Sequence, residues 1–450
     1  MKLYRNTIPA DLLTPLAAYL QLRPAGAGLL LESAERGERV GRHSFVLLDT
    51  GGEVTLPAPA RGWVDAVRGF LPRVDCGVGL PVGVGLAGYV GFEALAGLEP
   101  SVPLPAANSL GLPAVHMKLI AAAVVFDHLY QTAELQVLAA TESEGNVHLA
   151  RLAELLESPQ AAPVEEVGAP VAQPLRTRTD YEALVRRSQT LIREGDVYQV
   201  VPSRRIRVTA PPSPLTAYRR LRRTNPSPYA FLLEWPGCAL VGASPEMLVR
   251  VAGGEAETLP IAGTAARTGN EAQDERRARA LLADPKELAE HQMLVDLARN
   301  DLGRVAVSGS VRVEHPLAIH RTSRLLHITT TVRCRVRTGL DALDVLAAAF
   351  PAGTVSGAPK IRAAQRIVEM EGEHRGPYGG ALLRLGADGA LDTALILRTA
   401  IYAGGAAYLQ AGAGIVRASE PAREYLETVQ KMTAVAAALG VTLDEGSAAT

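Results

Sequence analysis

Strand-like segments in this chain of 450 residues come in clusters between helices instead of alternating with them. These segments lie at residues 231–234, 239–242, 323–332, 394–401 and 407–411. Neighbouring parallel strands need a long crossover, usually a helix, whereas antiparallel strands do not. The clustering therefore predicts antiparallel sheets with helices packed outside them, which is an α+β fold.

Three helices are indicated by their start and stop signals. The first begins at a capping box formed by Thr179 and Glu182, and it ends at Gly195. The second covers residues 285–300 and has a proline at its first position. The third begins near Pro421 and ends before the glycine at position 440.

A glycine-rich segment from Gly83 to Gly88 has the spacing of a dinucleotide-binding fingerprint. That fingerprint requires a preceding strand and a helix that starts within it. Here Pro81 precedes the segment, and a β-like pattern with a further glycine at Gly91 follows it. We therefore predict a glycine-rich strand with close backbone packing, and no dinucleotide site.

The clearest change in composition lies at residues 157–174, where four prolines are interspersed with alanine, glutamine and valine. No helical or strand periodicity remains there, as is typical of a linker. We expect four regions, which are an N-terminal region (1–156), a linker or surface crossing (157–178), a catalytic region (179–440) and a C-terminal tail (441–450).

Composition excludes several classes of protein. The chain has 46 Lys and Arg against 47 Asp and Glu, so its net charge of -1 excludes nucleic-acid binding through bulk charge. Residues 1–6 are too polar for a signal peptide, and no apolar run reaches the ~18 residues that span a bilayer. Three widely spaced cysteines indicate a reducing compartment. We therefore expect a soluble cytoplasmic protein that binds neither nucleic acid nor a membrane.

Two of the predicted helices carry carboxylates three residues apart. Glu287 and Glu290 lie on the second helix, and Glu424 and Glu427 lie on the third. Each pair shares one helical face, which is most often a solvated surface. Two pairs that face each other would instead suit Mg²⁺, which takes oxygen ligands and keeps several waters. Lys431, four residues after Glu427, either binds an anionic ligand or forms an ordinary helical salt bridge.

Four further features have both a structural and a functional interpretation. Arg398 lies in the apolar run 394–401, which is typical of a buried strand, so it needs either a bound or a structural carboxylate. Residues 412–414, Gly-Ala-Gly, form either an anion-binding backbone or a simple turn. His327 is either a satisfied core residue or a catalyst. Glu246 follows a strand and a tight turn, and desolvation would make it a proton donor.

A series of short motifs follows in order along the chain. They occupy residues 195–201, 225–229, 242–246, 260–264, 289–301, 351–360, 412–415 and 424–431. In this order they resemble the chorismate-utilising enzymes, and among these the large subunit of anthranilate synthase. The resemblance covers nearly the whole chain. It implies two packed antiparallel sheets with helices outside, and it assigns chorismate binding to residues 179–440.

The resemblance also implies the roles of individual residues. Mg²⁺ would be held by Glu290 and Glu427, with Glu287 and Glu424 nearby, and would bind the ring carboxylate of chorismate. The substrate-binding residues would be Gly263, Thr264, Tyr378, Arg398, Gly412, Ala413, Gly414 and Lys431. The catalytic residues would be Glu246, His327, Gln199 and Thr354, with Glu246 protonating the departing 4-hydroxyl group.

Two positions distinguish the nucleophiles used within the family. Members that form isochorismate or salicylate carry a lysine where this chain has Gln199, and aminodeoxychorismate synthases carry one where it has Ala262. With both lysines missing, ammonia is the nucleophile that remains. The expected reaction gives anthranilate and pyruvate, the first step of tryptophan biosynthesis. The alternatives are an aminodeoxyisochorismate synthase and an aminodeoxychorismate synthase component I.

The resemblance further implies a protein partner and an inhibitor. No cysteine lies in a Gly-x-Cys-x-Gly segment of a glutamine amidotransferase, so a separate glutaminase subunit would deliver ammonia, in a hetero-oligomer. L-Tryptophan would act as a feedback inhibitor. Its expected site comprises Glu32, Ser33, Pro228, Tyr229 and Ala230. Ala230 replaces the usual methionine and leaves room beside the expected indole ring.

Overall fold

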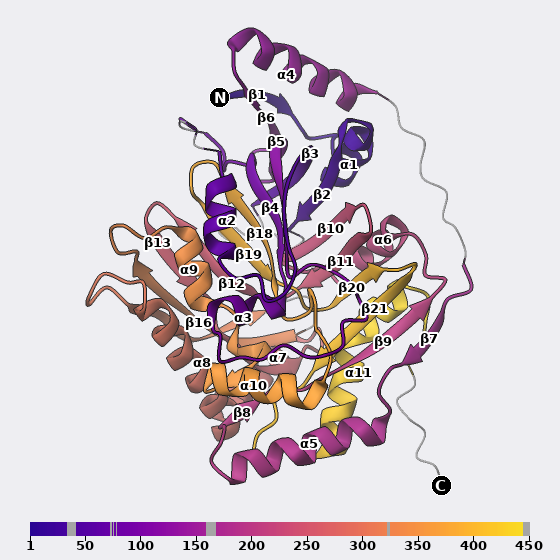
Figure 1. The fold of residues 1–450 in the computed structure, drawn as a ribbon, viewed down its shortest axis with the longest axis vertical. Helices are drawn as coiled ribbons and strands as arrows, with labels where there is room; N and C mark the ends of the chain where they lie inside the picture. The colour runs from indigo at the N-terminus through magenta and orange to yellow at the C-terminus, as the bar shows by residue number, and fades with distance from the viewer. Residues whose placement is uncertain are drawn as a thin grey trace.

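The fold is seen in a computed structural model of the chain. The structure describes residues 1–33, 42–72, 74, 76–77, 79–158, 168–321 and 325–443. The colours in Figure 1 show that early and late parts of the chain lie side by side in the centre of the molecule. None of the helices in the described part is both long and apolar enough to cross a membrane.

Antiparallel strands form the centre of the molecule. In the first half of the chain they are β1 (Lys2–Pro9), β2 (Ala27–Glu32), β3 (His43–Leu56), β4 (Gly85–Val90), β5 (Val115–Asp127), β6 (Thr132–Ala139), β7 (Val171–Pro174), β8 (Gln199–Val200) and β9 (Ser203–Thr209). They continue with β10 (Tyr229–Trp235), β11 (Cys238–Ser244), β12 (Met247–Ala252), β13 (Glu255–Thr258), β14 (Ile261–Ala266), β15 (Arg312–Arg321) and β16 (Leu325–Arg335). The last are β17 (Gly357–Ala358), β18 (Ala381–Gly386), β19 (Leu391–Leu395), β20 (Thr399–Ala403) and β21 (Ala406–Gly412).

The predicted α+β class is confirmed, and the strands join more closely than two separate sheets would. Nineteen strands belong to one hydrogen-bonded network, and β8 and β17 form a separate pair. The network runs from β9 and β21 through β20, β11, β10, β2 and β3 to β5, and then through β4, β18, β19, β12 and β13 to β16. One core cluster contains side chains from both arms, including Leu240 and Tyr408 from one and Tyr89 and Leu382 from the other. The two layers are therefore arms of one folded network.

Helices cover the outer faces of these layers (Figure 1). They are α1 (Pro15–Leu22), α2 (Trp63–Phe70), α3 (Leu95–Leu98), α4 (Glu142–Glu157), α5 (Arg178–Arg193) and α6 (Pro214–Thr224). They continue with α7 (Glu271–Ala283), α8 (Pro285–Gly303), α9 (Ala342–Ala349), α10 (Lys360–Glu371) and α11 (Pro421–Ala438). Short 3-10 turns lie at Arg23–Ala25, Phe92–Ala94 and Gly353–Val355.

The predicted helix starts are correct at two of three positions. Pro285 and Pro421 open α8 and α11, as predicted. The capping box at Thr179 and Glu182 is wrong, because Thr177 is the N-cap of α5 and forms a capping box with Asp180. Both pairs have the same spacing, and only the structure shows which threonine has the extended backbone of a cap. The predicted stop is correct, since Gly195 has a φ of 76° directly after the C-cap.

The glycine-rich segment is a strand, as expected. β4 lies between β5 and β18 in the network. A Cβ atom on Gly88 would lie 2.1 Å from the backbone oxygen of His116, and one on Gly85 would lie 2.3 Å from that of Leu385. The glycines therefore allow close contact between strands.

The predicted linker and tail fall partly outside the described residues. Residues 159–167 of the linker and 444–450 of the tail lie there. Within the remainder of the linker, Val171–Pro174 forms β7, which pairs with β9 at one edge of the network. Strands of the N-terminal region pair with strands of the catalytic region, as β2 does with β10 and β4 does with β18.

Candidate active site

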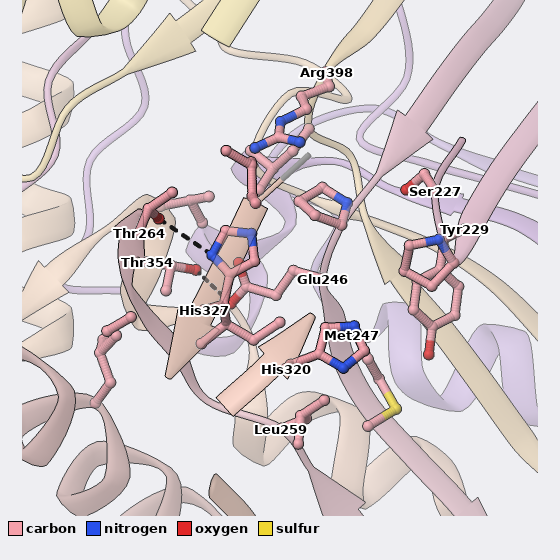
Figure 2. Close-up of a pocket in the computed structure, with 18 of the residues that line it drawn as sticks. Ser227, Tyr229, Glu246, Met247, Leu259, Thr264, His320, His327, Thr354 and Arg398 are labelled. Atoms are coloured by element: carbon pink, nitrogen blue, oxygen red, sulfur yellow. Dashed lines mark hydrogen bonds between the residues drawn. The ribbon is translucent and has the colours of Figure 1, made fainter. Parts of the chain in front are cut away.

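A cavity of about 520 Å³ collects most of the predicted site residues. Its walls come from β14, β16, α8, α11, the turn after β11 and the segment after β21. The predicted residues that line it are Gln199, Glu246, Gly263, Thr264, Glu290, His327, Thr354, Tyr378, Arg398, Gly412, Gly414, Glu427 and Lys431. Figure 2 shows Glu246, His327, Thr264, Thr354 and Arg398 around one space. Ala413, Glu287 and Glu424 are outside the set that lines it.

Glu246 lies in the two-residue turn between β11 and β12, where the strand ends and the chain reverses. Its Oε1 accepts a hydrogen bond of 2.9 Å from Oγ1 of Thr354 (Figure 2). Burial raises the pKa of Glu246 to about 7, against the lowering effects of Thr354, Lys431 and Arg398. At neutral pH this carboxyl is therefore protonated in a large share of the molecules, and in these it is able to donate a proton.

Arg398 was predicted within a continuous strand at 394–401, and this prediction is wrong. The run is divided into β19, which ends at Leu395, and β20, which begins at Thr399. Arg398 lies between them with a φ of 48°, in the left-handed region. The turn directs the guanidinium into the cavity, where Figure 2 shows it above Glu246. Burial lowers the pKa of Arg398, and Glu246 opposes this effect.

Tyr378 lines the same part of the cavity and is 4% exposed. Burial raises the pKa of its hydroxyl to about 12, so the phenol is neutral. The guanidinium of Arg375 lies 5.6 Å from the Tyr378 ring centroid and is itself fixed by Glu371 and two backbone carbonyls. Tyr378 is therefore held rigidly, with a hydroxyl suited to a hydrogen bond with an anion.

Lys431 lies on α11 beside the end of β21. Its Nζ contacts Oε1 of Glu427 at 2.7 Å and donates to the backbone oxygen of Gly412 at 3.0 Å. The salt-bridge interpretation of Lys431 is thus confirmed. Because Lys431 also lines the cavity, its binding of an anionic ligand stays a prediction. Gly412 ends β21, as predicted.

The carboxylates of α8 and α11 are close enough to influence one another. Burial raises the pKa of Glu290, and the charges of Glu287 and Glu427 raise it further. Burial also raises the pKa values of Glu287 and Glu424, and in both cases the charge of Glu427 adds to the effect. No group of three or more His, Cys, Asp or Glu side chains in the described residues has the geometry of a metal site. Only Glu290 and Glu427 of the four line the cavity.

Gln199 and the strand β14 also border the cavity. A Cβ on Gly414 would lie 2.6 Å from Nε2 of Gln199, so the glycine makes room for this amide. Ala262 lies on β14 and also lines the cavity. Gln199 and Ala262, the two positions expected from the resemblance to distinguish the nucleophile, therefore both border the same space.

His327 lies on β16, and its side chain points toward β14. Its Nδ1 lies 3.1 Å from Oγ1 of Thr264 and 3.4 Å from the backbone oxygen of Gly263. Gly263 has a φ of 71° at a register shift in the pairing of β14 with β16, which favours glycine there.

The structure adds cavity residues that the sequence reasoning missed. They include Arg250, His315, His320 and Gln410. His320 on β15 pairs directly with His327 on β16, so both occupy the same register position. Alternation of side chains within residues 312–321 is the sequence signal that could have indicated this strand. The pairing of His320 with His327 also depends on a bulge between Glu314 and Ala318, which the sequence pattern does not show.

A second cavity, of about 440 Å³, contains all five residues of the predicted tryptophan site. Glu32 lies at the end of β2, and it accepts a hydrogen bond from the Tyr218 hydroxyl and one of 3.0 Å from Nη2 of Arg222. Ala230 is 3% exposed and lies opposite Glu32 in the register of β10 with β2. Pro228 and Tyr229 line both cavities.

Comparison with known proteins agrees with the fold and identifies the family. Residues 43–437 match the family model described as chorismate binding enzyme. Component 1 of anthranilate synthase from Streptomyces coelicolor is 42% identical, covering 95% of this chain and 87% of the relative. The corresponding component from Thermus thermophilus is 41% identical and covers 96% of each chain.

Solved structures give the same result. Anthranilate synthase component I from Streptococcus pneumoniae has a TM-score of 0.82 at 32% identity, covering 95% of this chain and 98% of that chain. The menaquinone-specific isochorismate synthase from Escherichia coli shares the fold, with a TM-score of 0.75 at 20% identity, covering 97% of this chain and 94% of that one. The chain therefore belongs to the chorismate-binding enzyme family, among the relatives of anthranilate synthase component 1.

Proposed function

We propose that this chain is the large subunit of an anthranilate synthase and converts chorismate and ammonia to anthranilate and pyruvate. One observation carries the proposal. The cavity combines a protonatable carboxyl, Glu246, with the cations Arg398 and Lys431, and it has Gln199 and Ala262 where a lysine would supply another nucleophile or activate water. The relatives named component 1 of anthranilate synthase support the same assignment.

The proposed reaction begins with attack of ammonia on ring carbon C2 and loss of the hydroxyl group from C4. Glu246 donates its proton to the departing hydroxyl, which leaves as water. Arg398 and Tyr378 bind the enolpyruvyl carboxylate, and the backbone at residues 412–414 with Lys431 binds the ring carboxylate. These contacts orient a dianion before the bonds change. Elimination of pyruvate then gives the aromatic ring, with His327 as the candidate group for that step.

Mg²⁺ is the proposed cofactor, and the residues present fit it. Glu290 and Glu427 line the cavity from two helices, and the mutual effect of the carboxylate charges favours a cation between them. Mg²⁺ commonly uses one or two protein carboxylates, several waters and a substrate oxygen, so two glutamates are a sufficient set. When bound, Mg²⁺ would neutralise the ring carboxylate and fix its position.

Ammonia is proposed to come from a separate glutamine amidotransferase subunit, in a heteromeric enzyme. The name component 1 of the relatives supports a second component. The absence of a Gly-x-Cys-x-Gly segment from the sequence is consistent with it.

L-Tryptophan is the proposed inhibitor and would bind in the second cavity. Glu32 would bind the ammonium group, and the indole would lie beside Ala230, whose small side chain leaves an empty space next to the ring. Ala230→Met would fill this space, so it should tighten tryptophan binding, and Glu32→Gln should weaken it. Calorimetric titration with tryptophan measures both changes, and unchanged binding in both variants would contradict this site.

The proposed activity is tested by mixing the protein with chorismate, Mg²⁺ and an ammonium salt. The fluorescence of free anthranilate should rise, and pyruvate should form in equal amount. A stable aminated product that retains pyruvate would instead identify an aminodeoxyisochorismate synthase. A para-substituted product would identify an aminodeoxychorismate synthase. Chromatography of the products distinguishes the three.

A further inference from the structure

A small cavity of about 40 Å³ lies behind Glu246, separate from the substrate cavity. Glu246 and Thr354 line both cavities, so these two residues form part of the wall between them. Figure 2 shows the hydrogen bond from Thr354 to Glu246 on one side of the large cavity. Most of the other lining residues of the small cavity are apolar, but Asp301 of α8 also lines it. One small cavity is therefore bordered by two residues that carry carboxyl groups.

Asp301 is paired with a buried lysine. Its Oδ2 contacts Nζ of Lys360 at 2.7 Å, and the same Nζ donates to the backbone oxygen of Ala349 at 2.7 Å. Asp301 and Lys360 are each 8% exposed, and Arg304 is a further cation that acts on both. Burial raises the pKa of Asp301 to about 6, against the lowering effect of Lys360. Asp301 can therefore gain and lose a proton near neutral pH, although an ion pair holds it.

The proposed reaction leaves Glu246 in need of a proton after each turnover. Its Oε1 already accepts from Thr354, and the cations that face it are Lys431 and Arg398, on the side of the substrate cavity. While substrate or product fills that cavity, bulk water has no direct access to Glu246 from this side. The small cavity has volume enough for a water molecule, with Glu246 and Asp301 as polar partners.

We infer that Asp301 is a proton-relay residue that recharges Glu246 through water in the small cavity. This inference rests on the proposed role of Glu246 as the acid. Asp301 gives its proton to a water molecule, and that water gives a proton to the Glu246 carboxylate. Asp301 then takes a proton from bulk water, so the sequence is balanced and needs no other reactant. Lys360 acts as a positioning residue, because its ion pair fixes Asp301 at the cavity wall.

The test uses two variants that block the path in different ways. Asp301→Asn removes the titrating group, and Ala298→Val adds two methyl groups to a residue that lines only the small cavity, leaving the ion pair intact. Ala217→Val, at another buried helical alanine that lines neither cavity, is the matched control for overpacking. Anthranilate formation from chorismate and ammonium is measured in H₂O and in D₂O, with KM for chorismate and the thermal midpoint of each variant.

We expect both variants to lower kcat about tenfold or more and to increase the solvent isotope effect on kcat, with KM within twofold of the wild type. The control should change neither kcat nor the isotope effect. Wild-type isotope effects in both variants, or a loss of kcat in Asp301→Asn alone, would overturn the relay. If Asp301→Asn does not fold, the kcat and the isotope effect of Ala298→Val alone decide whether the relay is correct. A wild-type protein that makes no anthranilate would contradict the proposed function instead.

Discussion

Glu246 acquires its chemistry from its position. A glutamate on a surface loop is ionised at neutral pH, whereas burial in the wall of the cavity raises the pKa of this one to about 7. The hydroxyl of Thr354 fixes one carboxyl oxygen, and the cations Arg398 and Lys431 keep the pKa from rising further. The same residue in another turn would be an ordinary polar side chain.

The pH dependence of turnover follows from this pKa. Glu246 must be protonated to act as the acid, so kcat at a constant concentration of free ammonia should fall as the pH rises through about 7. Glu246→Gln should lower kcat by about 10²–10⁴-fold and remove this fall. The assay is anthranilate fluorescence between pH 6 and 9, with buffered ammonium adjusted at each pH. A fall of the same shape in Glu246→Gln would show that another group causes it.

Gly414 determines the position of Gln199. A Cβ at this position would displace the end of a flexible side chain, since Nε2 of Gln199 lies 2.6 Å from it. Gly414→Ala should therefore leave the thermal midpoint nearly unchanged and lower kcat/KM by about tenfold to a hundredfold. Gly69→Ala, where a Cβ meets nothing within 4 Å, is the matched control and should behave as the wild type. Equal activity of the two variants would contradict a role for the Gln199 position.

Among the elements, α8 and α11 bring the two carboxylate pairs to the cavity. Each helix starts at a proline after an acidic residue, Asp284 or Glu420. The second residue of each pair, Glu290 or Glu427, lines the cavity. The helices come from segments more than a hundred residues apart in the chain. The proposed metal site therefore depends on how both helices pack against the sheet.

Loss of the carboxylate on α11 tests that site. Glu427→Gln keeps the size of the side chain and removes its charge, so Mg²⁺-dependent turnover should fall by about a hundredfold or more while the fold is retained. Titration with Mg²⁺ followed by anthranilate formation and by calorimetry measures the effect. Glu420→Gln, on an exposed carboxylate of the same helix region, is the control. Unchanged Mg²⁺ dependence in Glu427→Gln would refute the metal assignment.

The start of α5 offers a direct test of the corrected capping box. Thr177→Ala removes a side-chain acceptor for the N–H of Asp180, so it should lower the free energy of unfolding by about 1 kcal/mol. Thr179→Ala lies in the first turn of the same helix, is exposed and should have little effect. Urea unfolding followed by circular dichroism measures both. A larger loss in Thr179→Ala would restore the prediction made from the sequence.

At the scale of the whole molecule, the N-terminal and catalytic regions share one strand network. β2 pairs with β10, and β4 pairs with β18, so each region would expose unpaired strand edges without the other. The core cluster described above, which lies between the two arms, also combines side chains of both regions, such as Tyr89 and Leu382. The two cavities therefore lie within one framework, and they share Pro228 and Tyr229 in their walls.

Unfolding should accordingly be cooperative across both regions. Trp63 and Trp235 lie in different core clusters, so their fluorescence reports on separate parts of the molecule. We expect fluorescence and circular dichroism to give coincident transitions in urea, and a fragment of residues 1–158 to lack cooperative unfolding when expressed alone. Two separated transitions, or a stably folded fragment, would contradict this expectation.

Local patterns were sufficient for much of the fold. Clustered strand segments predict antiparallel sheets, the prolines at 285 and 421 predict helix starts, and the glycines at 83–88 predict close strand packing. Each of these depends on the backbone preferences of a few neighbouring residues. Most of the catalytic, substrate-binding and metal residues that the family resemblance assigned line the cavity. A series of motifs in order identifies a family even though no single motif has that power.

Other features could be decided only in the folded molecule. Two threonines, Thr177 and Thr179, lie in a sequence pattern typical of an N-cap. The backbone between β7 and α5 makes Thr177 the N-cap. The apolar run 394–401 satisfies a strand pattern, yet it turns at Arg398 so that the guanidinium reaches the cavity. The pairing of His320 with His327 and the small cavity between Glu246 and Asp301 depend on register and packing over long separations. The sequence by itself determined which chemical groups are present and which segments become helices or strands, because these depend on local geometry. Tertiary structure alone decided which groups meet and how far each is buried, because the contacts and desolvation that set their pKa values come from distant parts of the chain.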